Sequence, residues 1–212
     1  MSTINVAFAS NDLYVSHLEM ALFSMLRNAQ KNRFAIFILS SDISGASKSR
    51  ISRVCNLYGN ADVHFIKLSS ETFSKLKILK HFSRDMYSRY LLPELLGDEK
   101  KVLYLDSDTL VTGDITGLYN TELGDNLAAA VRDVGITKDD LQGYTKKLEL
   151  DDKQYFNSGV LLLNLEQMRK EDIAKRLVEE TDRLSDKLQH PDQDIINLVM
   201  RDRIKELPNT WN

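Results

Sequence analysis

The sequence is poor in the residues that build disulfides, linkers and membrane spans. Its 212 residues include one cysteine, three prolines and nine glycines. A single cysteine excludes an internal disulfide framework and any zinc site made of several cysteines. So few prolines and glycines leave little room for a flexible linker, and no apolar run approaches the roughly 20 residues of a membrane-spanning helix. We therefore expect one domain over residues 1–212, without a transmembrane segment.

The sequence also lacks a strong excess of either charge. It has 28 Lys and Arg against 31 Asp and Glu, for a net charge of −3. Proteins that bind nucleic acid carry a basic surface that this composition does not supply, so we expect no nucleic-acid partner. Residues 1–5 do not show the basic stretch and apolar core of a secretory signal. A cytoplasmic location is the expectation.

What the sequence does contain is an alternation of apolar runs with amphipathic stretches, which is typical of α/β proteins. Strands are predicted at residues 4–9, 34–39, 63–66, 101–105, 127–131 and 160–163. Helices are predicted at residues 14–28, 44–58 and 83–92, the last ending ahead of Pro93, with two more after Asp172 and near Asp192. The run at 160–163 is too apolar to be half exposed, so it suits a strand covered on both faces. One sheet is expected to run through the chain.

An acidic pair, Asp106 and Asp108, follows the strand predicted at 101–105. In an extended chain, residues two apart point to the same side, so both carboxylates can face one point. Open α/β sheets bind ligands beyond the carboxyl ends of their strands. A divalent cation would relieve the repulsion between the carboxylates and bridge to phosphate oxygens. The pair therefore predicts a site for Mg²⁺ or Mn²⁺ with a diphosphate. Taken alone, however, so short a motif is more often a polar turn at the end of a strand.

The surrounding segments change that balance, because five of them occur in the order typical of one enzyme family. They are Ala-Ser-Asn-Asp-Leu-Tyr at 9–14, Met-Tyr-Ser-Arg-Tyr at 86–90, the run ending in Asp-Ser-Asp at 102–108, Tyr-Phe-Asn-Ser-Gly and the apolar run after it at 155–164, and Asp-Gln-Asp-Ile-Ile-Asn at 192–197. Together they resemble the family-8 retaining glycosyltransferases, which include bacterial lipopolysaccharide galactosyltransferases and glucosyltransferases. The resemblance spans Ile4 to Asn212. It implies the GT-A fold, a Rossmann-like α/β domain with a mixed, mostly parallel central sheet flanked by helices.

The resemblance implies a nucleotide site and a metal site. Asp106 and Asp108 match the pair that holds Mn²⁺ (or Mg²⁺) against the diphosphate of a UDP-sugar. The implied nucleotide-binding residues are Ala9, Ser10, Asn11, Tyr14, Asp106 and Ser107. The family usually has Asp where Asn11 stands and often Asn where Leu13 stands. The first change keeps a hydrogen-bonding side chain and the second loses a polar contact.

The resemblance also implies a site for the donor sugar. Its residues are Arg89, Asp106, Asn157, Ser158, Asp192 and Gln193. The planar guanidinium of Arg89 suits hydroxyl or phosphate oxygens. Asp192 and Gln193 are the implied catalytic residues, with Gln193 near the anomeric carbon. If the resemblance is set aside, Asp192 is read as an acidic cap that is favoured by the helix dipole. His81 aligns with a histidine that lines the family's donor pocket.

One element of the family is missing from the sequence. A histidine further along the family's chain completes the metal site, whereas this sequence stops at Trp211 and Asn212. We expect that the chain is the C-terminally truncated part of a longer protein. The missing part could carry a peripheral contact with the inner face of the membrane.

The predicted function is metal-dependent transfer of galactose or glucose from a UDP-sugar to a hydroxyl of a saccharide or glycolipid acceptor, with retention of configuration. Two alternatives stay open. A haloacid-dehalogenase-type phosphatase also has an Asp-x-Asp after a strand, although Leu110 stands where that pattern has Thr or Val. A UDP-sugar-binding module with impaired catalysis would explain the missing histidine and the changes at Asn11 and Leu13.

Overall fold

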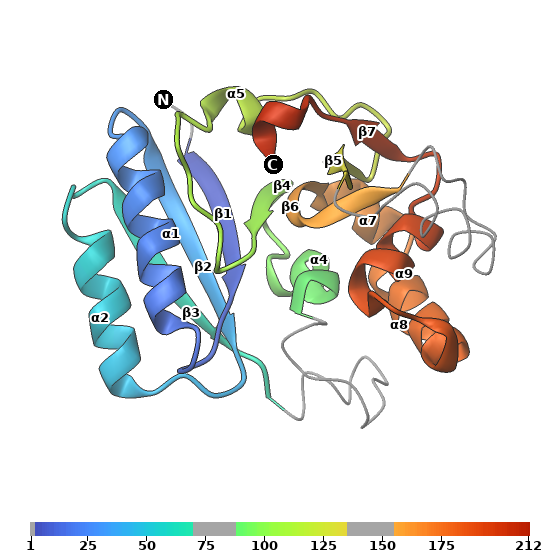
Figure 1. Cartoon of the computed structure of the whole chain (residues 1–212), viewed down its shortest axis with the longest axis horizontal. Helices are drawn as coiled ribbons and strands as arrows, with labels where there is room; N and C mark the ends of the chain where they lie inside the picture. The colour runs from blue at the N-terminus through green and yellow to red at the C-terminus, as the bar shows by residue number, and fades with distance from the viewer. Residues whose placement is uncertain (1–2, 70–87, 135–154) are drawn as a thin grey trace.

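The computed structural model describes residues 3–69, 88–134 and 155–212. These residues form a seven-stranded sheet with the order β3-β2-β1-β4-β6-β5-β7 (Figure 1). Its strands are β1 Thr3–Ala9, β2 Arg33–Ser40, β3 Ala61–Lys67, β4 Lys101–Leu105, β5 Ala128–Arg132, β6 Phe156–Asn164 and β7 Ile204–Glu206. The predicted α/β class is confirmed.

Helices connect most of these strands. The α-helices are α1 Val15–Asn28, α2 Gly45–Cys55, α4 Leu92–Leu95, α5 Thr116–Tyr119, α7 Leu165–Lys170, α8 Ile173–Leu184 and α9 Pro191–Val199. Short 3₁₀ helices are η1 Ser88–Leu91, η3 Ser185–Lys187 and η4 Asn209–Trp211. Within the described ranges, none of these helices combines the length and the apolar character that crossing a bilayer requires.

The sheet is mixed and mostly parallel, as predicted. β1 runs parallel to β2 and β4, β2 runs parallel to β3, and β5 runs parallel to β7. β6 lies between β4 and β5 and is antiparallel to both. Because β6 runs the other way, its first residues lie at the edge of the sheet where β1 and β4 end. This topology brings the ends of three strands to one place.

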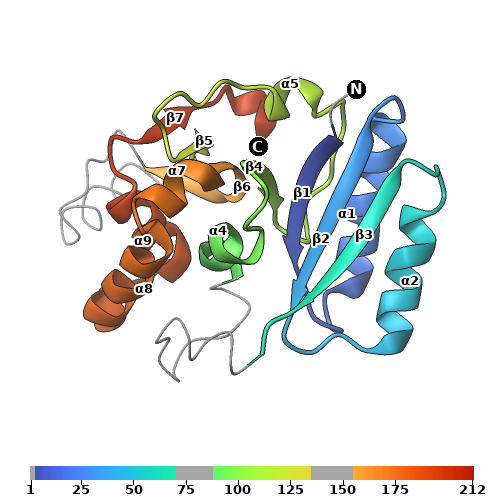
Figure 2. The same ribbon diagram turned by 180° about the vertical axis from the view of Figure 1, so that it is seen from behind.

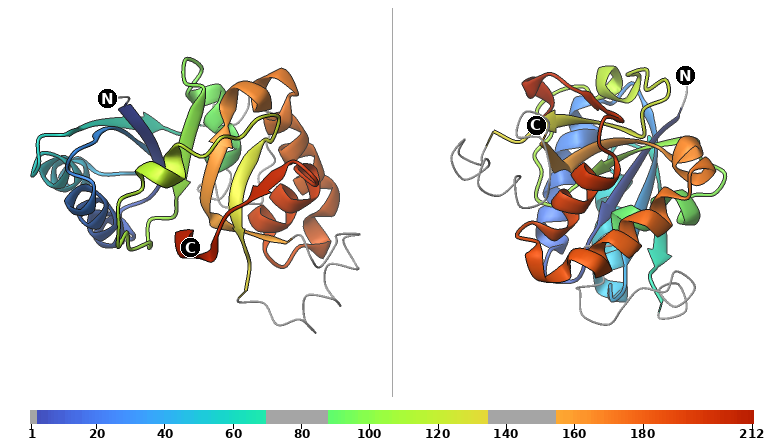
Figure 3. Two further views of the ribbon diagram at one scale, coloured as in Figure 1. Left: turned by 90° about the horizontal axis from the view of Figure 1, so that it is seen from above. Right: turned by 90° about the vertical axis from the view of Figure 1, so that its right-hand side faces the viewer.

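Two apolar cores cover the two faces of the sheet. Side chains alternate along a strand, so Val6 and Phe8 of β1 pack in the core with α1 and α2, whereas Ala7 packs in the other core. α1 and α2 lie in front of β1 to β3 in Figure 1 and behind them in Figure 2. The second core packs β4 and β6 against α7, α8 and α9, and Figure 3 shows these helices at the opposite end of the molecule from α1 and α2.

Some predicted element ends are wrong. The helix predicted at 44–58 ends at Cys55. The helix predicted to end before Pro93 continues through it, because Pro93 lies in the first turn of α4, where a missing N–H breaks no hydrogen bond. The predicted start of that helix, Ser83, lies outside the described residues. Asp172 precedes α8 as predicted, but it has a φ of 51° and its side chain makes no capping hydrogen bond. β7 was not among the predicted strands.

Candidate functional site

The ends of β1 and β4 and the beginning of β6 meet around Asp106. The Asp106 N–H donates to the carbonyl oxygen of Gly159 at 2.8 Å, which joins the end of β4 to β6. The Ser107 hydroxyl donates to the carbonyl oxygen of Ala9 at 2.5 Å, which joins the same segment to the end of β1. The acidic pair is therefore held between the other two segments.

Asp106 and Asp108 border two cavities. The first, of about 430 Å³, lies on the β1 side and is lined by Ala9, Ser10, Asn11, Tyr14, Arg89, Tyr104, Asp106, Ser107, Asp108 and Asp192. The second, of about 580 Å³, lies on the β6 side, where Asn157, Gly159 and Trp211 contribute to its lining. The first cavity contains most of the residues that the sequence motifs single out.

The carboxylate of Asp106 is fixed by two donors to the same oxygen. Its Oδ1 accepts hydrogen bonds from the Tyr104 hydroxyl at 2.9 Å and from Arg89 Nη2 at 3.0 Å. Burial raises the pKa of Asp106, and the Arg89 charge opposes that rise. Burial also raises the pKa of Tyr104 far above its ordinary value, so the hydroxyl keeps the proton that it donates. The structure presents Asp106 in one defined orientation with 35% of its side chain exposed.

Arg89 connects Asp106 to the first turn of α9. Its Nη1 lies 2.7 Å from Asp192 Oδ2 and donates to the carbonyl oxygen and the hydroxyl of Ser158 at 2.9 and 3.0 Å. Its guanidinium carbon lies 4.5 Å from the centre of the Tyr104 ring. Ser158 completes the group by donating its hydroxyl proton to Asp192 Oδ2 at 3.0 Å. The buried guanidinium of Arg89 therefore forms ion pairs with two carboxylates from different elements.

The acidic pair is brought together by a turn and not by an extended chain. The chain turns at Ser107 and Asp108, and both the N–H and the hydroxyl of Thr109 donate to the Asp106 carbonyl oxygen, at 3.2 and 2.8 Å. The extended geometry predicted for this segment is thus wrong, although both carboxylates still border the same cavities. Among residues 3–69, 88–134 and 155–212, no three His, Cys, Asp or Glu side chains group as metal ligands.

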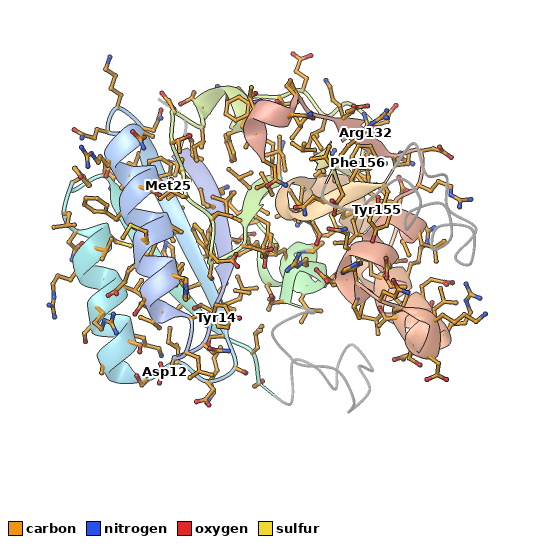
Figure 4. The ribbon with its side chains drawn as sticks, in the orientation of Figure 1. Asp12, Tyr14, Met25, Arg132, Tyr155 and Phe156 are labelled. Atoms are coloured by element: carbon orange, nitrogen blue, oxygen red, sulfur yellow. The ribbon has the colours of Figure 1, made fainter. Side chains whose placement is uncertain are left out.

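The loop after β1 is organised by Asn11. Its Oδ1 accepts the N–H groups of Leu13 at 3.0 Å and Tyr14 at 3.3 Å, just before α1 begins at Val15. The Asn11 side-chain oxygen can accept these two hydrogen bonds as a carboxylate oxygen would. Leu13 is 86% exposed and Tyr14 49% exposed. Tyr14 lines the first cavity, and Figure 4 shows it at the beginning of α1.

Three predicted site residues do not line the first cavity. Asn157 lines the second cavity, and its Oδ1 accepts the Gly159 N–H at 2.8 Å and an Asn212 amide proton at 2.7 Å. Ser158 and Gln193 line neither of these cavities. Gln193 is buried, and its Oε1 accepts the Ser158 N–H at 3.0 Å while its Nε2 donates to Asp133 at 2.7 Å. Ser158 contacts Arg89 and Asp192 directly, and Gln193 contacts Ser158.

Two residues of the site are absent from the predicted set. Tyr104 holds Asp106 through its hydroxyl. Gly159 leaves room for it, because a Cβ there would lie 2.9 Å from Asp106 Oδ2 and 3.1 Å from Asn157 Oδ1. A glycine inside an otherwise apolar strand signals such a close approach. Three residues noted in the sequence, His81, Met86 and Tyr87, lie outside the described residues.

Comparison with known proteins agrees with these features. Residues 5–212 match the model of glycosyl transferase family 8. Glycosyltransferase GlyE of Streptococcus pneumoniae is 30% identical over 212 residues, covering 98% of this chain and 47% of GlyE. Lipopolysaccharide 1,2-glucosyltransferase of Escherichia coli is 27% identical over 219 residues, covering 99% of this chain and 62% of that enzyme. The chain thus spans about half to three fifths of the length of these relatives.

A solved structure shows the same arrangement. The galactosyltransferase LgtC, in complex with donor and acceptor sugar analogues, aligns with a TM-score of 0.84 and 32% identity over 96% of this chain and 73% of LgtC. Another LgtC structure carries an active-site substitution of glutamine by glutamate. The seven-stranded mixed sheet with its flanking helices is the GT-A fold. The chain belongs to glycosyltransferase family 8.

Proposed function

We propose that this protein transfers a hexose, galactose or glucose, from a UDP-sugar to a hydroxyl of a saccharide or glycolipid acceptor, with a divalent cation and with retention of configuration. The observation that carries the proposal is the position of Asp106 and Asp108, which border one cavity with the nucleotide loop at 9–14 on one side and Arg89 and Asp192 on the other. Membership of family 8 makes the phosphatase alternative unnecessary.

Asp106 and Asp108 are the residues that would hold Mn²⁺ or Mg²⁺. They fit such an ion because carboxylate oxygens are hard ligands, and Mg²⁺ in particular is commonly held by one or two carboxylates together with phosphate oxygens and water. Asp106 is fixed on one oxygen by Tyr104 and Arg89, so its orientation does not have to be organised by the ligand. A bound cation would supply Lewis-acid stabilisation of the charge that develops on a leaving diphosphate.

The nucleotide and the sugar are proposed to bind on opposite sides of the acidic pair. Tyr14 has the exposed ring on which a uracil base can stack, and Asn11 holds that loop at the start of α1. Arg89 and Asp192 reach the same cavity from the other side, where their charged groups can bind sugar hydroxyls. In this arrangement the diphosphate lies over Asp106 and Asp108.

The sequence motif implies that Gln193 acts near the anomeric carbon, and we propose that role although its side chain is buried and lines neither cavity. Its Oε1 is held by the Ser158 N–H and its Nε2 by Asp133, so the amide is oriented before a donor binds. A preorganised dipole of this kind stabilises developing positive charge at low reorganisation cost. LgtC is described as having a glutamine in its active site, which supports a glutamine at the reaction centre of this chain as well. We propose retention because the five motifs resemble those of retaining enzymes.

The acceptor, a cytoplasmic location and contact with a membrane surface stay predictions from the sequence. LgtC is described as a galactosyltransferase bound to donor and acceptor sugar analogues, and the Escherichia coli relative as a lipopolysaccharide glucosyltransferase. These names support a hexose donor and a saccharide acceptor for this chain.

The proposal is tested by thermal unfolding of the protein with UDP-galactose, UDP-glucose, UDP-N-acetylglucosamine and GDP-mannose, each with Mn²⁺ and with EDTA. We expect a rise in the midpoint only for a uridine nucleotide with Mn²⁺, because ligands that bind the folded state raise its stability. Equal midpoints for all samples would contradict the proposed function. Binding followed by neither transfer nor hydrolysis would instead favour the impaired module.

A further inference from the structure

The first two turns of α9 contact the beginning of β6 through buried polar side chains. Asp194 is fully buried, and Asn197 is 2% exposed. Neither residue is required for the proposed binding of metal or nucleotide. Burying such groups is unfavourable unless each is hydrogen-bonded, so their partners show what they hold in place.

Asp194 connects the start of α9 to Tyr155. Its Oδ2 accepts the N–H groups of Gln189 at 3.2 Å and His190 at 2.9 Å, which lie just before the helix. Its Oδ1 accepts the Tyr155 hydroxyl at 2.5 Å. Tyr155 immediately precedes β6, and Figure 4 shows it beside Phe156, the first residue of that strand. One carboxylate thus fixes the position of the helix start relative to the strand start.

Asn197 makes a second connection, one helical turn further along. Its Oδ1 accepts the Phe156 N–H at 2.7 Å, and its Nδ2 donates to the Phe156 carbonyl oxygen at 2.8 Å. The pairing of β5 with β6 is irregular between Ala130 and Arg132, next to this point. The amide of Asn197 therefore pairs with Phe156 as a neighbouring strand would, and it sets the register between α9 and β6.

Two site contacts lie next to these connections along both elements. Gln193 Oε1 accepts the Ser158 N–H, and Asp192 Oδ2 accepts the Ser158 hydroxyl. Both distances are 3.0 Å. A small shift of α9 along β6 would break both, and with them the contact between Asp192 and Arg89. The register of the helix against the strand therefore decides whether the proposed sugar-binding groups meet.

We propose that Tyr155, Asp194 and Asn197 are positioning residues, which hold α9 in register with β6 so that Asp192 and Gln193 are oriented for the donor sugar. The effect on the sugar rests on the proposed function, whereas the effect on the register does not. The nucleotide loop follows β1 and is held by Ser107 and Asn11. Loss of the register should therefore weaken the recognition of the sugar and leave that of UDP intact.

The experiment compares Tyr155→Phe with Tyr119→Phe. Tyr119 is a matched control because it is also buried, and its hydroxyl donates to the Lys101 carbonyl oxygen at 3.4 Å, near the start of β4. Calorimetry with Mn²⁺ gives the affinities for UDP, UDP-galactose and UDP-glucose. We expect Tyr155→Phe to weaken the preferred UDP-sugar about fivefold or more, in line with the loss of a hydrogen bond to a charged group, with UDP unchanged. Equal weakening of UDP and UDP-sugar, or no change in either, would overturn the sugar-positioning role.

Hydrogen exchange of the unliganded variants tests the register without any ligand. Tyr155→Phe should speed exchange at the amides of Ser158, Gln189 and His190, and Tyr119→Phe should leave these amides unchanged. Asp194→Asn should act at the same amides more strongly, because it places an amide donor among groups that already donate. Unchanged exchange at these amides in both Tyr155→Phe and Asp194→Asn would overturn the proposal. If the wild type binds no UDP-sugar while exchange changes as expected, the proposed function fails and the register role stands.

Discussion

The two sides of the first cavity are built differently. The side on which we propose that the nucleotide binds, called the nucleotide side, is made of β1 to β3 with α1 and α2. It is held by the parallel pairing of β1 with β2, from Thr3–Arg33 to Ala9–Leu39, and by apolar packing, in which α1 buries Leu18, Leu22 and Met25. The side on which we propose that the sugar binds, called the sugar side, is made of η1, the end of β4, the start of β6 and the start of α9, and it is held by buried polar and charged groups. These are Arg89, Ser158, Gln193, Asp194 and Asn197.

Because of this difference, the residues that stabilise the fold and those that face the ligand are separate on the nucleotide side and shared on the sugar side. On the nucleotide side the core is apolar and the ligand-facing loop is exposed, so the loop can change without cost to the core. On the sugar side the groups that would face the ligand also hold the elements together, because Arg89 and Ser158 contact each other and both contact Asp192. Substitutions on the sugar side should therefore change both the stability of the fold and the affinity for the ligand. Substitutions on the nucleotide side should change one of these without the other.

The largest expected effect is that of Arg89→Met on the sugar side. It leaves the carboxylates of Asp106 and Asp192 without their shared cation, and removing one partner of a buried ion pair costs about 3 kcal/mol. Arg132→Met is the matched control, because Arg132 pairs with Glu206 at the surface, where such pairs contribute about 0.5 kcal/mol. Urea unfolding measures both variants. Equal losses of stability would contradict the difference between the two sides.

The next effect is that of Gly159→Ala, which places a methyl group against Asp106. Because the new Cβ would lie 2.9 Å from Asp106 Oδ2, either the carboxylate or β6 must move, and such overpacking costs about 1–3 kcal/mol. We expect lower thermal stability together with weaker Mn²⁺-dependent UDP binding. Gly97→Ala is the control, since a Cβ at Gly97 meets no atom within 4 Å. If Gly159→Ala binds UDP like the wild type, Gly159 does not make room for a ligand-binding carboxylate.

Tyr14→Ala on the nucleotide side should change binding alone. The side chain is half exposed, so its loss should alter the unfolding free energy by less than about 0.5 kcal/mol. Base stacking on an aromatic ring contributes about 1–3 kcal/mol, so UDP should bind about tenfold more weakly. Met20→Ala, at an exposed position on α1, should change neither quantity. A large loss of stability in Tyr14→Ala would show that the loop is not independent of its core.

The smallest effect is expected at Cys55 in the apolar core of the nucleotide side. Burial raises the pKa of its thiol to about 12, so the reactive thiolate is scarce at any pH below that value. We expect no alkylation by iodoacetamide at pH 8 in the native protein and rapid alkylation in urea, measured by mass spectrometry. Rapid reaction without urea would mean that this core opens readily.

Much of the fold follows from the sequence. β4 has the predicted bounds, 101–105, because an apolar run ends there abruptly at Asp106. The helix predicted after Asp172 is confirmed as α8, in which Ile173, Leu177, Thr181 and Leu184 are all buried. Cys55, the single cysteine, is buried in the apolar core. Local patterns are sufficient in these cases, because a continuous apolar run marks a strand buried on both faces and regular apolar spacing marks the buried face of a helix.

The remaining features depend on contacts between distant segments. β6 is longer than the predicted 160–163, because backbone groups of Phe156 and Gly159 near its start pair with Asn197 and Asp106, far away in the sequence. β7 has only three residues, too few for a period to show. In the sequence, Asp194 resembles an ordinary acidic residue at the start of a helix. Its partner Tyr155 lies 39 positions earlier, so only the folded structure reveals their contact. The sequence motifs named most of the first cavity, but not how its sugar side is held.

The central claim is that Asp106 and Asp108 together hold a cation against the diphosphate of a uridine nucleotide. Calorimetric titration of UDP into the wild type and Asp108→Asn, with Mn²⁺ and with EDTA, tests it most directly. Asp108 borders both cavities, and its replacement removes a charged ligand while keeping the size of the side chain. The account predicts that the Mn²⁺-dependent part of UDP binding disappears in Asp108→Asn while the unfolding midpoint is unchanged. Equal affinities of both proteins with Mn²⁺ would contradict it.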